Sequence, residues 1–103
     1  MELRSNARLL FVSGQIGIAP DGSRATDFEA QCEVAMTNVE ALLTAAAMTH
    51  TDIVKLVFYL TRAVDLPTLG EHRRKRWASS TPPAVTTLVV AALARPELLV
   101  ESR

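Results

Sequence analysis

Cysteine and histidine are scarce in this chain of 103 residues, and their scarcity argues against an internal disulfide bond and against a metal site. The single cysteine, Cys32, has no partner for an internal disulfide bond. It lies on a predicted apolar helix face, which favours a small buried side chain over a nucleophile. The only histidines are His50 and His72, and no second cysteine or spaced carboxylate completes a metal-binding set with either. We therefore expect no metal and no other cofactor.

Net charge and long apolar runs are also missing. The 11 Lys and Arg residues balance the 11 Asp and Glu residues, so the chain has no overall attraction for polyanions or membrane surfaces. The longest apolar run, residues 88–94, is far shorter than the roughly 20 residues that span a bilayer. Residues 1–8 contain no apolar core of the signal-peptide type. These absences predict a cytoplasmic protein with no membrane partner.

The chain does contain enough apolar residues for one small core. Hydrophobic residues make up 49% of the sequence, and the length fits a single domain over residues 1–103. A chain of this size buries only roughly 60 to 65% of its unfolded surface, so its stability as a monomer is marginal. Because burial at a subunit interface adds stability, we expect an oligomer.

The spacing of apolar residues predicts an α+β fold. Apolar residues in 27–48 recur every three or four positions, as on one face of a helix, and Thr26 with Glu29 fits a capping box at its start. Asp65 is expected to cap a second helix with Pro67 in its first turn. The predicted order is strands 9–12 and 16–18, helix 27–48, strand 53–60, a helix from 65 to about 77, and strands 85–93 and 98–102. Both helices are expected on one face of a mixed sheet.

The strand predicted at residues 53–60 is apolar on both faces. Leu56, Phe58 and Leu60 alternate with Val57 and Tyr59. Helices can cover one face of this strand, so the other face requires a second sheet or a neighbouring subunit.

The basic stretch at residues 72–76, with the sequence His-Arg-Arg-Lys-Arg, has two interpretations. A basic cluster is typical of nucleic-acid contact. However, successive helical residues are about 100° apart, so these side chains surround the helix instead of forming one stripe. Cations in the last turns of a helix are also stabilised by the helix dipole. With zero net charge, we favour helix capping and solvation over a nucleic-acid partner.

A few residues carry candidate chemistry. Glu101 is the only acid in residues 98–101, where strand alternation places it beside a sheet face. It is a candidate general acid or base, and the alternative is an exposed edge residue that prevents aggregation. At Gly14 the missing Cβ lets another group approach the backbone. Thr86 and Thr87 point to opposite faces of their strand, so at most one of them lines a given pocket.

Several short segments occur together in a characteristic order. They are Phe-Val-Ser-Gly-Gln-Ile at 11–16, Asp-Ile-Val-Lys at 52–55, Val-Phe-Tyr-Leu-Thr at 57–61, Pro-Ala at 83–84 and Leu-Val-Glu at 99–101. Their order and approximate spacing resemble the RidA/YjgF family of small reactive-imine deaminases, formerly called endoribonuclease L-PSP. The resemblance covers nearly the whole chain, from about Leu9 to Glu101.

This resemblance implies a chorismate-mutase-like fold assembled as a homotrimer. The three sheets form a central β-barrel with the helices outside, and small-molecule ligands bind in clefts between subunits. In active members of the family a glutamate on the last strand positions water for attack on the C=N carbon, and Glu101 matches that glutamate. Ser13, Gly14 and Gln15 match the loop whose backbone groups line the cleft.

At two further positions this sequence differs from many members of the family it resembles. Val85 occupies the position at which active members carry an arginine that binds the substrate carboxylate, and Thr87 falls where some members have cysteine. A charge-assisted hydrogen bond from arginine contributes about 1.5 to 3 kcal/mol, and valine offers nothing comparable. Arg62, Arg95 and Arg103 are candidate replacement cations.

Three hypotheses about function follow from these residues. The first is a hydrolase that adds water to an imine or enamine, with Glu101 as catalytic residue. The second is a non-catalytic homotrimer that binds a small metabolite in the same clefts. The third is an RNA-binding or endoribonuclease protein that uses residues 72–76. The sequence does not identify the substrate or ligand.

Overall fold

The computed structural model of the chain describes residues 7–103; residues 1–6, part of the segment predicted to lack a signal peptide, lie outside the described residues. The helices are α1 (Phe28–Ala45) and α2 (Leu66–Arg76). The strands are β1 (Lys55–Leu60), β2 (Ala84–Val89) and β3 (Val100–Ser102). Two short 3-10 helices, η1 (His50–Asp52) and η2 (Ala63–Asp65), precede β1 and α2.

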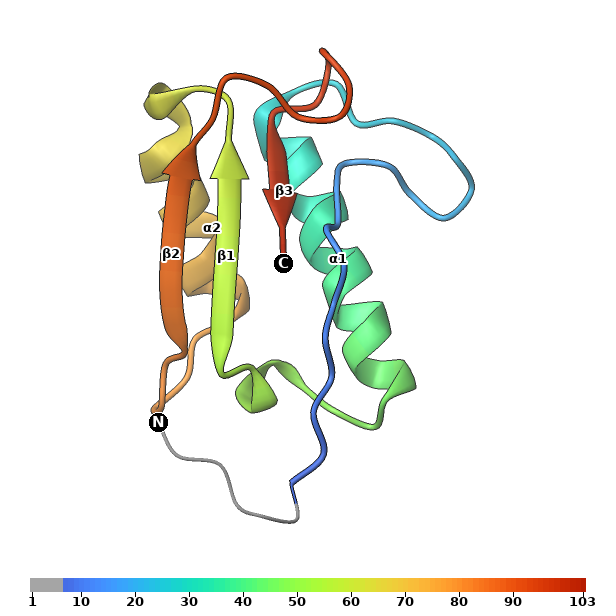
Figure 1. The fold of residues 1–103 in the computed structure, drawn as a ribbon, viewed down its shortest axis with the longest axis vertical. Coiled ribbons are helices and arrows are strands. Elements are labelled where there is room, and N and C mark those ends of the chain that lie inside the picture. The colour runs from blue at the N-terminus through green and yellow to red at the C-terminus, as the bar shows by residue number, and fades with distance from the viewer. Residues whose placement is uncertain (1–6) are drawn as a thin grey trace.

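The strands form one mixed sheet in the order β2-β1-β3. β1 is parallel to β2 and antiparallel to β3. The parallel pair is joined through α2, because parallel neighbours need a crossover connection. Figure 1 shows α2 behind β1 and β2, and α1 behind β3, so both helices lie on one side of the sheet. The predicted α+β fold with two helices on one face of a mixed sheet is confirmed.

The core lies between this sheet and the helices. Leu56, Phe58 and Leu60 of β1 are buried against apolar residues of α1 such as Met36 and Val39. The opposite face of the sheet carries no helix in the part of the chain that the structure describes (Figure 1). We call it the open face. Helices therefore cover only one face of β1, as the sequence predicted.

The ends of α1 differ from the prediction. The capping box of Thr26 and Glu29 is wrong: Asp27 is the N-cap, and its carboxylate accepts a hydrogen bond of 2.7 Å from the Ala30 backbone N–H. The extended backbone of Asp27 directs its short side chain over the free N–H groups of the first turn. The helix ends at Ala45 instead of residue 48 because Ala47 adopts a left-handed conformation, with φ of 57°, that reverses the chain.

The strands predicted at residues 9–12 and 16–18 are wrong. Among the described residues, this region makes only isolated bridges, Gln15 with Ser102 and Ile18 with Arg24. The backbone of residues 9–12 finds no neighbouring strand within the described chain. Leu9, Leu10 and Phe11 are exposed, Phe11 to 88%, whereas Val12 is half-buried against the core. A β-prone sequence forms a strand only where a partner strand is available.

The remaining boundaries shift by a few residues. β1 begins at Lys55 because the preceding residues turn in η1, while β2 and β3 are shorter than predicted. Asp65 does precede α2, but its carboxylate accepts a hydrogen bond of 2.7 Å from Arg62 Nε and caps no helical N–H. None of the helices among residues 7–103 has the length and apolar character needed to cross a bilayer.

Candidate functional site

An acid, a cation and a phenol meet on the open face of the sheet. Glu101 of β3 pairs in register with Tyr59 of β1. Arg103 Nε donates a hydrogen bond of 2.9 Å to Glu101 Oε2, and the Arg103 guanidinium carbon lies 5.3 Å from the centre of the Tyr59 ring. These side chains line a cavity of about 330 Å³ together with residues of the 90–94 segment that follows β2. We call it the Glu101 cavity.

The carboxylate of Glu101 lies against the backbone of Gly14. A Cβ added to Gly14 would be 2.5 Å from Glu101 Cδ and 2.6 Å from Oε2, so only glycine fits beside this carboxylate without displacing it. The close approach predicted at Gly14 therefore occurs, and Glu101 is the group that approaches. Gln15 adds paired backbone hydrogen bonds to Ser102, of 2.8 and 2.9 Å, which hold this segment beside β3.

Two amide side chains of α1 hold the two segments next to Glu101, residues 97–99 and residues 16–18. Gln31 is fully buried: its Nε2 donates to the Glu97 carbonyl at 3.0 Å, and its Oε1 accepts from the Leu99 N–H at 2.7 Å. Asn38 Nδ2 donates to the Ile18 carbonyl at 2.9 Å. Sequence reasoning missed both residues. For Gln31, a signal was available, because this amide lies on the predicted buried face of α1, three residues after Phe28.

The other predicted site residues are not all brought to the Glu101 cavity. Val85 is in register with Leu56 and Thr87 with Phe58, so both side chains lie on the helix-covered face. Within one chain they lie on the opposite side of the sheet from Glu101. Ser13 is exposed, and its carbonyl accepts a hydrogen bond of 3.1 Å from Gln15 Nε2.

Of the candidate replacement cations, the structure places Arg103 beside Glu101. Arg62 is instead paired with Asp65, and Arg95 is exposed and does not line the Glu101 cavity. Tyr59 was not predicted as a site residue. Its position opposite Glu101 depends on the register of β1 and β3, which the sequence does not reveal.

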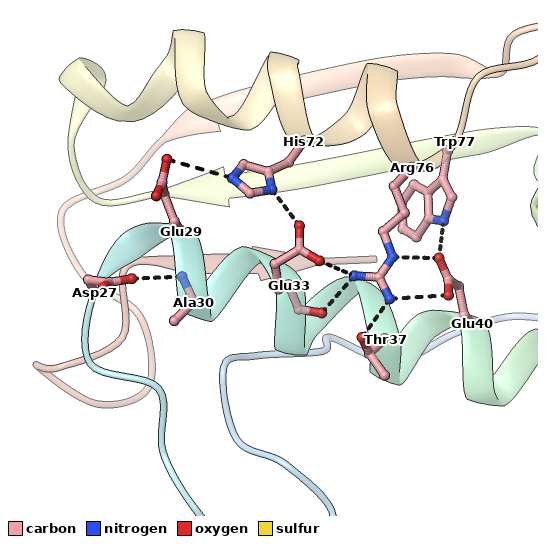
Figure 2. A network of polar contacts seen from close by, with 9 residues as sticks. All are labelled: Asp27, Glu29, Ala30, Glu33, Thr37, Glu40, His72, Arg76 and Trp77. Atoms are coloured by element: carbon pink, nitrogen blue, oxygen red, sulfur yellow. Dashed lines mark hydrogen bonds and ion pairs between the residues drawn. The ribbon is translucent and has the colours of Figure 1, made fainter.

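The basic stretch at residues 72–76 is divided between different surroundings. Figure 2 shows His72 and Arg76 pointing from α2 toward the acids of α1. His72 Nδ1 donates to Glu33 at 2.5 Å, and Arg76 Nε donates to Glu40 at 2.7 Å. The Arg76 hydrogen bond lowers the pKa of Glu40 below its ordinary value of 4.5, and the bond from Trp77 Nε1 acts in the same direction. The stretch therefore does not form one continuous basic surface.

The single cysteine does not line the Glu101 cavity. Cys32 is buried in the core, and this burial raises the pKa of its thiol from 9.0 to about 12. The interpretation of Cys32 as a small buried side chain is confirmed. Among residues 7–103, no three His, Cys, Asp or Glu side chains are grouped so that they could hold a metal ion.

Comparisons with known proteins point to one family. A family model described as Endoribonuclease L-PSP matches residues 3–103. The chain is 43% identical to the RutC family protein YjgH of Escherichia coli over 53 residues, which are 52% of this chain and 40% of YjgH. It is 33% identical over 64 residues to TdcF of Escherichia coli, whose name includes the words reactive intermediate deaminase. That match covers 61% of this chain and 50% of TdcF, so the aligned part spans half or less of each relative.

A solved structure shares the architecture over almost the whole chain. It is YyfB, of the Rid protein family, from Yersinia pestis, with a TM-score of 0.87 at 27% identity. The superposition covers 97% of this chain and 78% of YyfB. Together with the matched family model, this similarity shows that the chain belongs to the RidA/YjgF family, the family described as Endoribonuclease L-PSP.

Proposed function

We propose that this protein hydrolyses small reactive imines at the Glu101 cavity. The observation that carries the proposal is the placement of Glu101: its side chain is only 17% exposed, lies against Gly14 and lines the cavity. A carboxylate held in this way suits general acid–base catalysis. The similarity to TdcF, whose name contains the words reactive intermediate deaminase, supports the same reaction class.

The chemistry requires one water molecule and one carboxylate. Oε2 of Glu101 is bonded to Arg103, which leaves Oε1 to accept a hydrogen bond from water. In the proposed reaction the water oxygen bonds to the C=N carbon while Glu101 takes a water proton and transfers it to the nitrogen. The hydroxyl proton of the resulting carbinolamine then moves to the nitrogen, the C–N bond breaks as the C=O bond forms, and ammonia leaves. The balance is imine plus water giving a carbonyl compound plus ammonia.

Arg103 supports a carboxylate-bearing substrate, a 2-imino acid. Only its Nε is bonded to Glu101, so the terminal guanidinium N–H groups are available to bind a substrate carboxylate. In this proposal Arg103 supplies the cation that the resemblance assigned to position 85, where this chain has valine. Ser13, Val85 and Thr87 of one chain do not line the Glu101 cavity. In this proposal they contact the substrate from a neighbouring subunit.

We further propose that the protein is a cytoplasmic homotrimer, in which the open faces of three sheets form a β-barrel and the ligand clefts lie between subunits. The apolar side chains of the open face support assembly, because they include Leu88, which is 48% exposed. Apolar patches of this kind are typical of protein interfaces. β2 is also a sheet edge with unpaired backbone groups within the described residues.

One observation favours a second candidate function, a non-catalytic trimer that binds a metabolite. Arg103 is paired with Glu101 itself, so each charge is partly neutralised by the other.

For the RNA hypothesis, pairing of His72 and Arg76 with α1 leaves Arg73, Arg74 and Lys75 for phosphate contact. Such contact requires binding that weakens steeply with salt.

The test is ammonia release from 2-imino acids generated in situ and from neutral imines. We expect the protein to accelerate hydrolysis of the 2-imino acids, and Glu101→Gln to lower kcat by about 10² to 10⁴-fold, the usual contribution of general acid–base catalysis. Arg103→Met should raise KM for 2-imino acids by about 10 to 150-fold more than it raises KM for neutral imines, which have no carboxylate for Arg103 to bind. The matched control is Arg95→Met, which removes an exposed arginine that does not line the Glu101 cavity.

The outcomes separate the candidate functions. If neither class of imine is hydrolysed faster than background, the proposed hydrolase activity is overturned. A saturable ligand-induced rise in Tm without turnover then supports the metabolite-binding trimer.

A further inference from the structure

A second cavity, of about 360 Å³, lies where the end of α2 meets η1 and the segment before β2. Most of its wall is apolar, and the apolar residues that line it include Trp77, Ile53, Leu56, Pro82 and Pro83. Leu56 belongs to the helix-covered face of the sheet, whereas Glu101 belongs to the open face. We call this second cavity the Trp77 cavity. It is separate from the Glu101 cavity.

All the ionisable side chains that line the Trp77 cavity are basic: His50, Arg73 and Arg74. Among the described residues, neither Arg73 nor Arg74 forms an ion pair, in contrast to Arg76 of the same helix. The Arg74 guanidinium folds back over Gly70, where an added Cβ would be 3.0 Å from Nη1. Two arginine residues thus line an apolar cavity, and no acidic residue is among its lining.

His50 is one of the residues that line this cavity. Its Nε2 donates to the Ala78 carbonyl at 3.1 Å, because a carbonyl oxygen can only accept. This bond connects η1 to the segment after α2 and leaves Nδ1 of His50 without a bond in the described structure. The wall is thereby held in place across residues far apart in the chain.

We propose that the Trp77 cavity binds a small carboxylic acid with an apolar body. The carboxylate would be held by Arg73 and Arg74, since a guanidinium presents paired N–H donors that match a carboxylate. The apolar body would lie against Trp77 and the prolines. The volume is in the range of small-molecule sites, which combine an apolar wall with a few polar groups. An inorganic phosphate fits less well because it has no apolar part to place against this wall.

Trp77 gives a direct readout because it is the only tryptophan in the chain. The probe is phenylacetate, and phenylacetamide is the uncharged match of the same shape. We expect phenylacetate to change the Trp77 fluorescence in a saturable way, with a Kd at least about tenfold lower than that of the amide, the loss expected without charge-assisted bonds. No saturable change with phenylacetate, or equal affinity for the amide, overturns the proposal.

Variants of the basic stretch locate the binding. Arg73→Gln and Arg74→Gln should each raise the Kd for phenylacetate by about tenfold or more. Lys75→Gln removes the same charge from the same helix, but Lys75 does not line the cavity. The Kd of this variant for phenylacetate should therefore stay unchanged. Glu101→Gln should also leave the Kd unchanged, because Glu101 lines a different cavity. Equal effects of the Lys75 and Arg73 substitutions would indicate general charge attraction and reject the site.

Discussion

At the scale of single residues, Gly14 and Gly17 lie in the same short segment but face different kinds of neighbour. The Cβ position of Gly14 is occupied by the carboxylate end of Glu101, which can rotate away. The Cβ position of Gly17 lies 2.6 Å from Cγ and 3.0 Å from Cα of Gln31, a fully buried residue of α1. Displacing Glu101 requires only a side-chain rotation, whereas displacing Gln31 requires a shift of a helix.

This difference predicts separate effects for two identical substitutions. Gly14→Ala should change the free energy of unfolding by less than about 1 kcal/mol but lower kcat/KM for imine hydrolysis by about 10 to 100-fold, because it moves the Glu101 carboxylate. Gly17→Ala should destabilise the fold by about 1 to 3 kcal/mol through overpacking. Urea unfolding and ammonia release measure the two effects. If Gly14→Ala retains full activity, the contact between Gly14 and Glu101 does not position the carboxylate.

At the scale of elements, α1 and α2 are joined by polar contacts beside their apolar core. Arg76 donates to Glu33, to Thr37 at 2.6 Å and to Glu40, and Glu40 also accepts from Trp77 (Figure 2). The bond to Glu40 also raises the pKa of Arg76, as expected for a stabilised ion pair. Because Arg76 serves several partners at once, it orients α2 on α1 more specifically than apolar contacts alone.

The lowered pKa of Glu40 predicts acid sensitivity of this helix pair. A carboxyl whose pKa is lower in the folded state than its ordinary value of 4.5 stabilises the fold above that value. This stability is lost as the pH falls through the folded-state pKa, because the protonated carboxyl no longer pairs with Arg76. Glu40→Gln should therefore lower the free energy of unfolding at pH 7 and flatten its decrease below pH 4.5.

Chemical denaturation at a series of pH values measures this effect. The control is Glu71→Gln, because Glu71 is exposed and forms no ion pair among the described residues. A pH dependence of Glu40→Gln identical to that of the unmodified protein would contradict the role of this pair.

At the scale of the whole molecule, the two faces of the sheet differ in the described chain: helices cover one face, and no helix covers the other. The helices bury one side of the sheet, while the open face exposes Leu88 of β2, which is in register with Tyr59 of β1. A small chain gains stability when such a surface is buried against a copy of itself. This asymmetry is the physical basis for expecting an oligomer.

Leu88→Lys tests that expectation. A lysine on the open face would place an unpaired charge in the proposed interface, so the trimer should dissociate. Light scattering should give about three times the chain mass of 11.2 kDa for the unmodified protein and about one chain mass for the variant. Val64→Lys is the matched control, because Val64 of η2 is 77% exposed and lies outside the sheet. A monomeric unmodified protein would reject the trimer and the clefts between subunits.

The sequence by itself determined the fold class, the helix-covered face of β1 and the family resemblance. These depend on local periodicity and on short segments in order, which the chain carries without reference to its final shape. The sequence was also enough to select Glu101 as a candidate, because it is the only acid in residues 98–101 and strand alternation places it beside a sheet face. The prediction of a strand at residues 9–12 was wrong because β propensity does not say whether a partner strand exists.

Only the tertiary structure decided which distant residues meet. It placed Arg103, Tyr59 and Gly14 around Glu101, turned Val85 to the other side of the sheet, and separated Arg76 from Arg73 on one helix. Periodicity specifies which side of an element is buried, but not which segment packs there. That choice depends on strand register and on the fit of side chains across the core, and these arise only when the whole chain is folded.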